Sequence, residues 1–234
     1  MEELFHHQSS QFDEELGRLR SDVLKMGGLV ENQVSAAIEA YDACDKDVIR
    51  DVIARDREVN ALEKLIDDES AHLIARRQPT ASDLRLVFGV TKIVTDLERI
   101  GDEAKKIAKG VRRICEAGLT PEQFGPGIRH IADAVLVMVR ESLDALARLD
   151  TVQADKVIED DARVDAEYKA VVRQLITHMM EDPRTISSAM DVIWIARAVE
   201  RIGDHAKNVA EHVIFIVEGR DIRHRGKAQQ EASA

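Results

Sequence analysis

The chain has few aromatic residues, prolines and cysteines, and it has no long uninterrupted hydrophobic run. Aromatic residues make up only 3% of the 234 residues and proline occurs four times, so its apolar residues are mainly Val, Ile, Leu and Ala. Its longest apolar stretches, such as residues 134–139, are too short to span a bilayer. The N-terminal residues lack the basic-then-apolar order of a signal peptide. We therefore expect a cytoplasmic protein without membrane insertion.

The two cysteines, Cys44 and Cys115, offer neither a disulfide framework nor the spacing of a metal motif, so we expect two semi-buried free thiols. The formal net charge is −11, which makes nucleic acid an improbable partner. The basic residues near the C-terminus are expected to form a flexible tail over residues 220–234. No convergent Arg/Lys cluster is evident, so direct phosphate binding is not readable from the sequence.

Apolar residues recur at alternating steps of three and four along nearly the whole chain, and no stretch has the two-residue period of a strand. Asp45, Asp150 and the Thr120-Pro121-x-Gln123 segment are typical of helix starts. Trp194 is expected to pack in the core. The interruptions predict six long helices, at residues 8–43, 46–77, 82–117, 121–149, 152–181 and 185–219.

The two halves of the chain are copies of one another. The segment "ERIGDEAKKIA" at 98–108 recurs as "ERIGDHAKNVA" at 200–210, and eight of the eleven positions are identical. Upstream, "DREVNA" at 56–61 aligns with "DARVDA" at 161–166. Three long helices per half, joined by short turns, predict an all-α fold of two tandem three-helix bundles. We place them at residues 1–118 and 119–219.

Acidic residues form a polar stripe on the last helix of the second half, with a second acidic pair on the helix before it. Like charges one turn apart destabilise a helix by about 0.2–0.5 kcal/mol per pair, and a bound cation would compensate for them. His205 could be a ligand, an outer neighbour or neither, because its direction around the helix is uncertain. The predicted second-half metal site contains Asp161, Asp165, Glu200, Asp204, His205, Asn208 and Glu211.

Gly101 and Gly203 occupy the same place in the two copies of "ERIGD". A glycine inside a helix costs about 0.8–1.0 kcal/mol relative to alanine. The duplicated glycine therefore suggests that another helix approaches closely at this point.

The paired "LERIGDEAKKIA" and "VERIGDHAKNVAEHV" motifs, with "DREVNALE" and "DARVDAEY" before them, resemble the PhoU family of phosphate transport regulators. This resemblance covers essentially the whole chain. It implies metal clusters, with iron or zinc as the usual metal and manganese or magnesium as further candidates. It also implies a homodimer that links the phosphate ABC transporter to a sensor histidine kinase and represses the phosphate-starvation response.

The resemblance also assigns a first-half site, at Asp56, Asn60, Glu98 and Asp102. Asn60 stands where an aspartate is expected, and Lys106 and Lys109 follow along the stripe. Because lysines can neutralise carboxylates without a metal, we expect this first site to be the weaker of the two.

Two alternatives remain open at this point. A ferritin-like di-iron enzyme needs Glu-x-x-His on two helices, and the sequence offers only Glu69 with His72 as a candidate, which reads more simply as a surface pair. A metal-free helical adaptor would keep the regulatory role and use the acidic stripes for docking. No catalytic motif is present, such as a glycine-rich phosphate loop, G-x-S-x-G or H-E-x-x-H, so we expect no enzyme.

Overall fold

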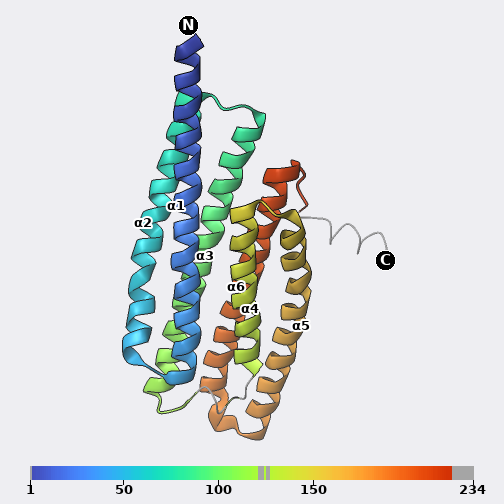
Figure 1. Ribbon diagram of the computed structural model, residues 1–234. Coiled ribbons are helices and arrows are strands. Elements are labelled where there is room, and N and C mark those ends of the chain that lie inside the picture. The colour runs from blue at the N-terminus through green and yellow to red at the C-terminus, as the bar shows by residue number, and fades with distance from the viewer. Residues whose placement is uncertain (1, 121–123, 125–126, 223–234) are drawn as a thin grey trace, which may run out of the picture.

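The computed structural model describes residues 2–120, 124 and 127–222. These residues form six long α-helices and one short 3-10 helix, and they contain no strand (Figure 1). The elements are α1 (Glu2–Ala43), α2 (Lys46–Arg77), α3 (Ala81–Glu116), α4 (Gly127–Arg148), α5 (Thr151–Glu181), η2 (Pro183–Thr185) and α6 (Ile186–Glu218).

Two of the predicted helix starts are N-caps in the structure. Asp45 Oδ1 accepts from the backbone N–H groups of Asp47 and Val48, at 2.8 and 3.3 Å, and so satisfies two free donors at the start of α2. Asp150 does the same at the start of α5, accepting from Val152 and Gln153. The third predicted start falls on residues 121–123, which lie outside the described residues. The described part of α4 begins at Gly127.

The helices pack in two groups of three with the same order, α1–α2–α3 and α4–α5–α6. The two groups lie side by side, and the N-terminal end of α1 extends beyond its neighbours (Figure 1). The expected all-α fold of two three-helix bundles is therefore confirmed. Within the described residues, no helix combines the length and the apolar character that a membrane crossing requires.

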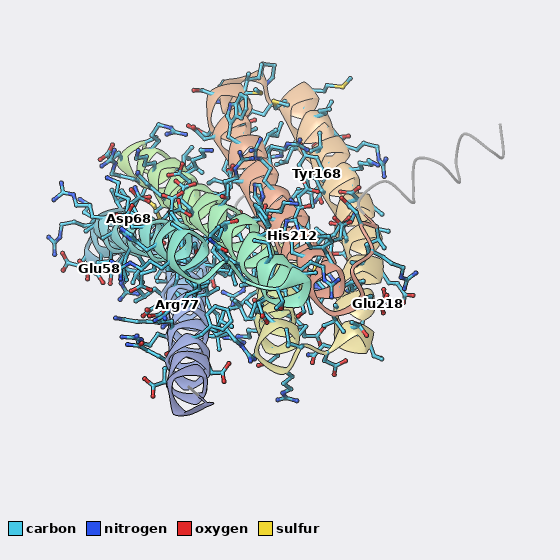
Figure 2. The ribbon with its side chains drawn as sticks, turned by 90° about the horizontal axis from the view of Figure 1, so that it is seen from above. Glu58, Asp68, Arg77, Tyr168, His212 and Glu218 are labelled. Atoms are coloured by element: carbon cyan, nitrogen blue, oxygen red, sulfur yellow. A yellow bond between two sulfur atoms is a disulfide. The ribbon has the colours of Figure 1, made fainter. Side chains whose placement is uncertain are left out.

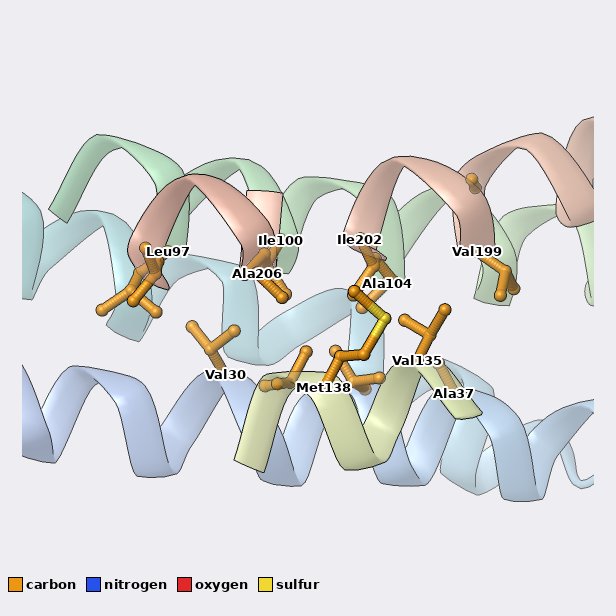
Figure 3. Close-up of a cluster of buried hydrophobic side chains, with 14 of the residues drawn as sticks. Val30, Ala37, Leu97, Ile100, Ala104, Val135, Met138, Val199, Ile202 and Ala206 are labelled. Carbon is orange, nitrogen blue, oxygen red and sulfur yellow. The ribbon is translucent and has the colours of Figure 1, made fainter. Parts of the chain in front are cut away.

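Helices α3 and α6 form the most extensive contact between any two elements, and they join the bundles. They run antiparallel: a Cβ at Gly110 would lie 2.7 Å from Ile195, whereas Gly89, earlier on α3, faces Ile216, later on α6. Buried side chains of α1, α3, α4 and α6 meet in one cluster across this contact (Figure 3). The bundles consequently share a single hydrophobic core, and the α3–α6 seam holds the polar groups considered below.

Gly101 lies at a close approach between helices, as predicted, whereas Gly203 has ordinary van der Waals neighbours only. A Cβ at Gly101 would lie 3.1 Å from Gln33 Oε1, and a Cβ at Gly203 would lie 3.5 Å from Val135 Cγ2. Val59 and Val164 are the neighbours from the preceding helix, and they occupy equivalent places in the two copies.

Two expectations from the sequence are wrong. Cys44 and Cys115 are joined in a disulfide, because the ends of α1 and α3 bring their Cα atoms to 6.0 Å although 71 positions separate them. Trp194 is 62% exposed and lies outside the core. It follows Ile193 on α6, and only the neighbouring Ile195 is turned fully inward.

Candidate metal site

Three carboxylates of the second bundle converge where α5 packs against α6. Asp165 comes from α5, and Glu200 and Asp204 stand one turn apart on α6. One oxygen from each residue lies within 4.8 Å of the others. Carboxylate oxygens in such a group are suitable ligands for hard or borderline cations. Among the described residues, it is the one group of three or more potential metal ligands that lie this close together.

The electrostatics of this site favour a cation. Burial and the neighbouring Asp204 together raise the pKa of Glu200 to about 7, although Arg197 acts to lower it. Burial, Asp161 and Asp165 likewise raise the pKa of Asp204. Glu200 Oε2 is buried and has no hydrogen-bond donor among the described residues. A buried acceptor beside other carboxylates is a position that a metal ion can satisfy, so these residues fit a bound cation.

Asp161 lies beside this group but already has a cationic partner. Lys207 Nζ lies 2.7 Å from Asp161 Oδ2. Burial acts to lower the pKa of Lys207, but the hydrogen bond to Asp161 and the surrounding carboxylate charges together outweigh burial and raise the pKa. Glu211, one turn beyond Lys207 on α6, is buried and adds to this effect. Neither residue belongs to the group of three converging carboxylates.

The first bundle repeats this pairing at the equivalent positions. Lys105 Nζ lies 2.6 Å from Asp56 Oδ2 and 3.7 Å from Asp102 Oδ1. Burial, Asp102 and Glu63 raise the pKa of Glu98. Asn60 Oδ1 is buried and accepts no hydrogen bond from the described residues. With an amide in place of the converging aspartate, the first bundle offers fewer charged ligands than the second.

The lysines that we expected to neutralise the first stripe do not do so. Lys106 pairs with Glu103 at 3.0 Å, and both Lys106 and Lys109 line a groove between α3 and α6. Lys105 takes the expected role for Asp56, and Lys207 takes the same role for Asp161. A lysine therefore does not distinguish the two sites. The difference between them lies in the carboxylates.

His205 and Asn208 contact a residue of α3 across the α3–α6 seam, and neither belongs to the group of three carboxylates. His205 Nδ1 lies 2.8 Å from Asp96 Oδ1 on α3, and Asn208 donates to the same oxygen at 3.0 Å. His212 Nε2 lies 3.3 Å from the other oxygen, Asp96 Oδ2. Figure 2 places His212 between α3 and α6, seen along the helices. These residues tie the two bundles together, and the structure does not bring His205 or Asn208 into the carboxylate group.

Asp96 and His212 were missed by the sequence analysis, although the helical period contains a signal. Asp96 follows Ile93 by three residues and precedes Ile100 by four, so it stands on the apolar face of α3. His212 stands likewise between Val209 and Ile216 on α6. Polar residues at core positions need partners when they are buried. Two facing helices with such interruptions predict a buried polar contact between them.

Glu69 and His72, the only candidate pair for a di-iron enzyme, are both exposed on α2. They line a shallow cavity of about 230 Å³ between α1 and α2, together with Glu15 and two arginines. This is the surface location expected from the sequence.

A model of the PhoU domain matches the chain twice, over residues 23–111 and 128–213. The chain belongs to the PhoU family. It is 50% identical over 225 residues to the Phosphate-specific transport system accessory protein PhoU homolog of Pseudomonas putida, covering 96% of this chain and 88% of that protein. It is 43% identical to the Phosphate-specific transport system accessory protein PhoU of Escherichia coli, covering 94% of this chain and 90% of that protein.

Two solved PhoU structures have the same fold. The crystal structure of PhoU from Pseudomonas aeruginosa superposes with a TM-score of 0.87 at 48% identity, covering 89% of this chain and all of that one. The phosphate transport system regulatory protein PhoU from Streptococcus pneumoniae superposes with a TM-score of 0.82 at 28% identity, covering 90% of this chain and 99% of that one. The family resemblance found in the repeated motifs is therefore confirmed.

Proposed function

We propose that this PhoU-family protein is a cytoplasmic, non-catalytic regulator of phosphate transport that represses the phosphate-starvation response. The observation that carries the proposal is the 50% identity, over nearly the whole chain, to a relative named as a phosphate transport accessory protein. The names of the relatives describe accessory or regulatory proteins. The absence of catalytic motifs in the sequence agrees with a non-enzymatic role.

In this proposal the protein docks as a homodimer on the ATPase of the phosphate ABC transporter and on a sensor histidine kinase. The rigid connection through α3 and α6 supports such a role, because two bundles with one shared core present fixed surfaces to two partners. The net charge of −11 disfavours nucleic acid as a third partner.

The proposal includes a metal ion, with iron or zinc as the first candidates, held by Asp165, Glu200 and Asp204. A cation would offset the mutual repulsion of these carboxylates and fix α5 against α6. Its role in this proposal is structural and regulatory.

A clean deletion in a strain without a second copy of the gene tests the regulatory role. We expect a phosphate-repressed reporter gene to become active in phosphate-rich medium, and expression of the wild-type chain to restore repression. Normal repression in the deletion strain would contradict the proposal. Capture of the transporter ATPase and the kinase by the tagged chain, from cells grown in phosphate-rich medium, tests the two partners separately.

A further inference from the structure

A basic groove of about 440 Å³ lies along the seam of α3 and α6, on the surface of the protein. Lys106, Lys109 and Arg113 line it from α3, at helical steps of three and four that place them on one face. Trp194, Arg197 and Arg201 line it from α6. We call this the α3–α6 groove. Its volume is in the range of small-molecule sites.

One buried carboxylate belongs to the α3–α6 groove and is already neutralised. Glu103 is 2% exposed, and its Oε1 lies 2.7 Å from Arg201 Nε and 3.0 Å from Lys106 Nζ. Two cations on one carboxylate leave a local excess of positive charge. Glu103 therefore positions Arg201 and Lys106 and does not cancel both of them.

The remaining cations increase this excess. Arg113 pairs with Asp191 at 2.7 Å, and Arg197 pairs with Glu200 at 2.6 Å. Lys109 has no ion pair with any residue in the described part of the chain. Five cationic side chains thus face three carboxylates in and around the groove. The surplus suits a ligand with two or three negative charges.

The duplication explains why this surplus is not balanced from within the chain. Repeat-related positions differ by 102. The part of the α3–α6 contact that forms the groove is therefore the counterpart of the part where Asp96 accepts from His205 and His212. Ala198, on the wall of the groove, stands at the position that corresponds to Asp96. Lys106 corresponds to Asn208, which donates to Asp96 in the other part of the contact. At this position the groove has a methyl group where the other part of the α3–α6 contact has a carboxylate, and its own carboxylate, Glu103, stands instead at the position of His205.

The groove also has an apolar contact where the other part of the α3–α6 contact has an imidazole, because Ile195 packs directly against Gly110. Gly110 lines the α3–α6 groove at the position that corresponds to His212, whose imidazole lies in the other part of the contact. Beside it, Ile195 and Ala198 form an apolar surface, and the exposed indole of Trp194 stands at the edge. An exposed tryptophan next to a basic cluster is well suited to stack against a planar ring.

We propose that the α3–α6 groove binds a nucleoside phosphate. The phosphate groups contact Lys106, Lys109 and Arg113, and the base lies against Trp194. This site is distinct from the three carboxylates of the candidate metal site, and the proposal does not rest on the role in phosphate transport.

Trp194 is the only tryptophan of the chain, so its fluorescence reports on the groove directly. The test titrates ADP into the full-length protein, with chelator present and excitation at the red edge, where adenine does not absorb. We expect saturable quenching that weakens as the ionic strength rises. Lys109→Glu should weaken ADP binding by about tenfold or more, because a charge-assisted contact becomes repulsive. Circular dichroism checks that the variant remains helical.

Lys25→Glu is the matched control, since it makes the same charge change at an exposed site on α1. It should leave ADP affinity within about twofold of the wild type. Calorimetry with Trp194→Leu tests stacking, and this variant should lose affinity for ADP but not for inorganic phosphate. Three results would each overturn the proposal: no saturable quenching by millimolar ADP, equal weakening by both lysine variants, or inorganic phosphate binding as tightly as ADP.

Discussion

Arg197 Nη1 lies 2.6 Å from Glu200 Oε1, so a single guanidinium joins the candidate metal site to the α3–α6 groove. Arg197 lines the groove, and Glu200 is one of the three converging carboxylates. A cation that binds Glu200 must compete with this guanidinium and is repelled by its charge. In the first copy, the position corresponding to Arg197 is Thr95, so this connection exists only in the second bundle.

Replacing Arg197 should strengthen cation binding. We expect Arg197→Gln to raise the affinity for a divalent metal such as Mn²⁺ several-fold, because a competing and repelling charge is removed. Metal titration of the chelator-treated protein measures the effect. Arg173→Gln, at an exposed position of α5, is the control and should change nothing. Unchanged or weaker affinity in Arg197→Gln would show that the guanidinium supports the site.

Asp96 should make the stability of the protein depend on acid pH. Burial acts to raise its pKa, but hydrogen bonds from His205, His212 and Asn208 outweigh burial and lower the pKa to about 2. A carboxylate whose folded-state pKa is depressed stabilises the fold above its unfolded value, near 4, and loses that contribution as the pH falls toward 2. Asp96→Asn should therefore cost about 2 kcal/mol at neutral pH, and the cost should shrink below about pH 4.

Urea unfolding of both proteins across this pH range checks the prediction. The control is Asp133→Asn, which alters an exposed ion pair with Arg129 and should cost less than about 1 kcal/mol. A cost for Asp96→Asn that stays constant as the pH falls would mean that the ionised carboxylate does not carry the contact.

The two motif glycines should respond differently to alanine. At Gly203 the nearest atom to a new Cβ is a Val135 methyl at 3.5 Å, an ordinary van der Waals contact. Gly203→Ala should therefore gain about 0.5–1 kcal/mol from helix propensity. At Gly101 the new methyl would lie 3.1 Å from Gln33 Oε1, a buried oxygen without a hydrogen bond among the described residues, so Gly101→Ala should bring no gain. Thermal unfolding compares them, and a similar gain in both variants would refute this distinction.

The helices, two of their caps and the duplication could be predicted because their signals are local. Asp45 and Asp150 cap helices through neighbouring N–H groups, and the apolar period identifies the buried faces. The convergence of Asp165 with Glu200 and Asp204 follows the matched carboxylate pairs on adjacent helices. The lysine partner of Asp161 was missed, because a residue such as Lys207 can turn toward either neighbouring helix.

The features that escaped the sequence analysis depend on contacts between distant segments. His205 faces Asp96 because α3 and α6 pack antiparallel across the two bundles, and no local pattern specifies that alignment. The same packing assembles the Arg/Lys cluster of the α3–α6 groove from two helices, so neither helix alone revealed it. The disulfide depends on the ends of α1 and α3 meeting at Cys44 and Cys115.

Metal content of purified variants tests the central claim, that the second bundle holds the cation, most directly. The measurement is elemental analysis of protein from metal-replete cells, for the wild type and two matched double variants. Glu200→Ala with Asp204→Ala removes two of the three converging carboxylates and should abolish most of the bound metal. Glu98→Ala with Asp102→Ala makes the equivalent change in the first bundle and should leave most of it. Equal losses from both variants, or a wild type without metal, would contradict the account.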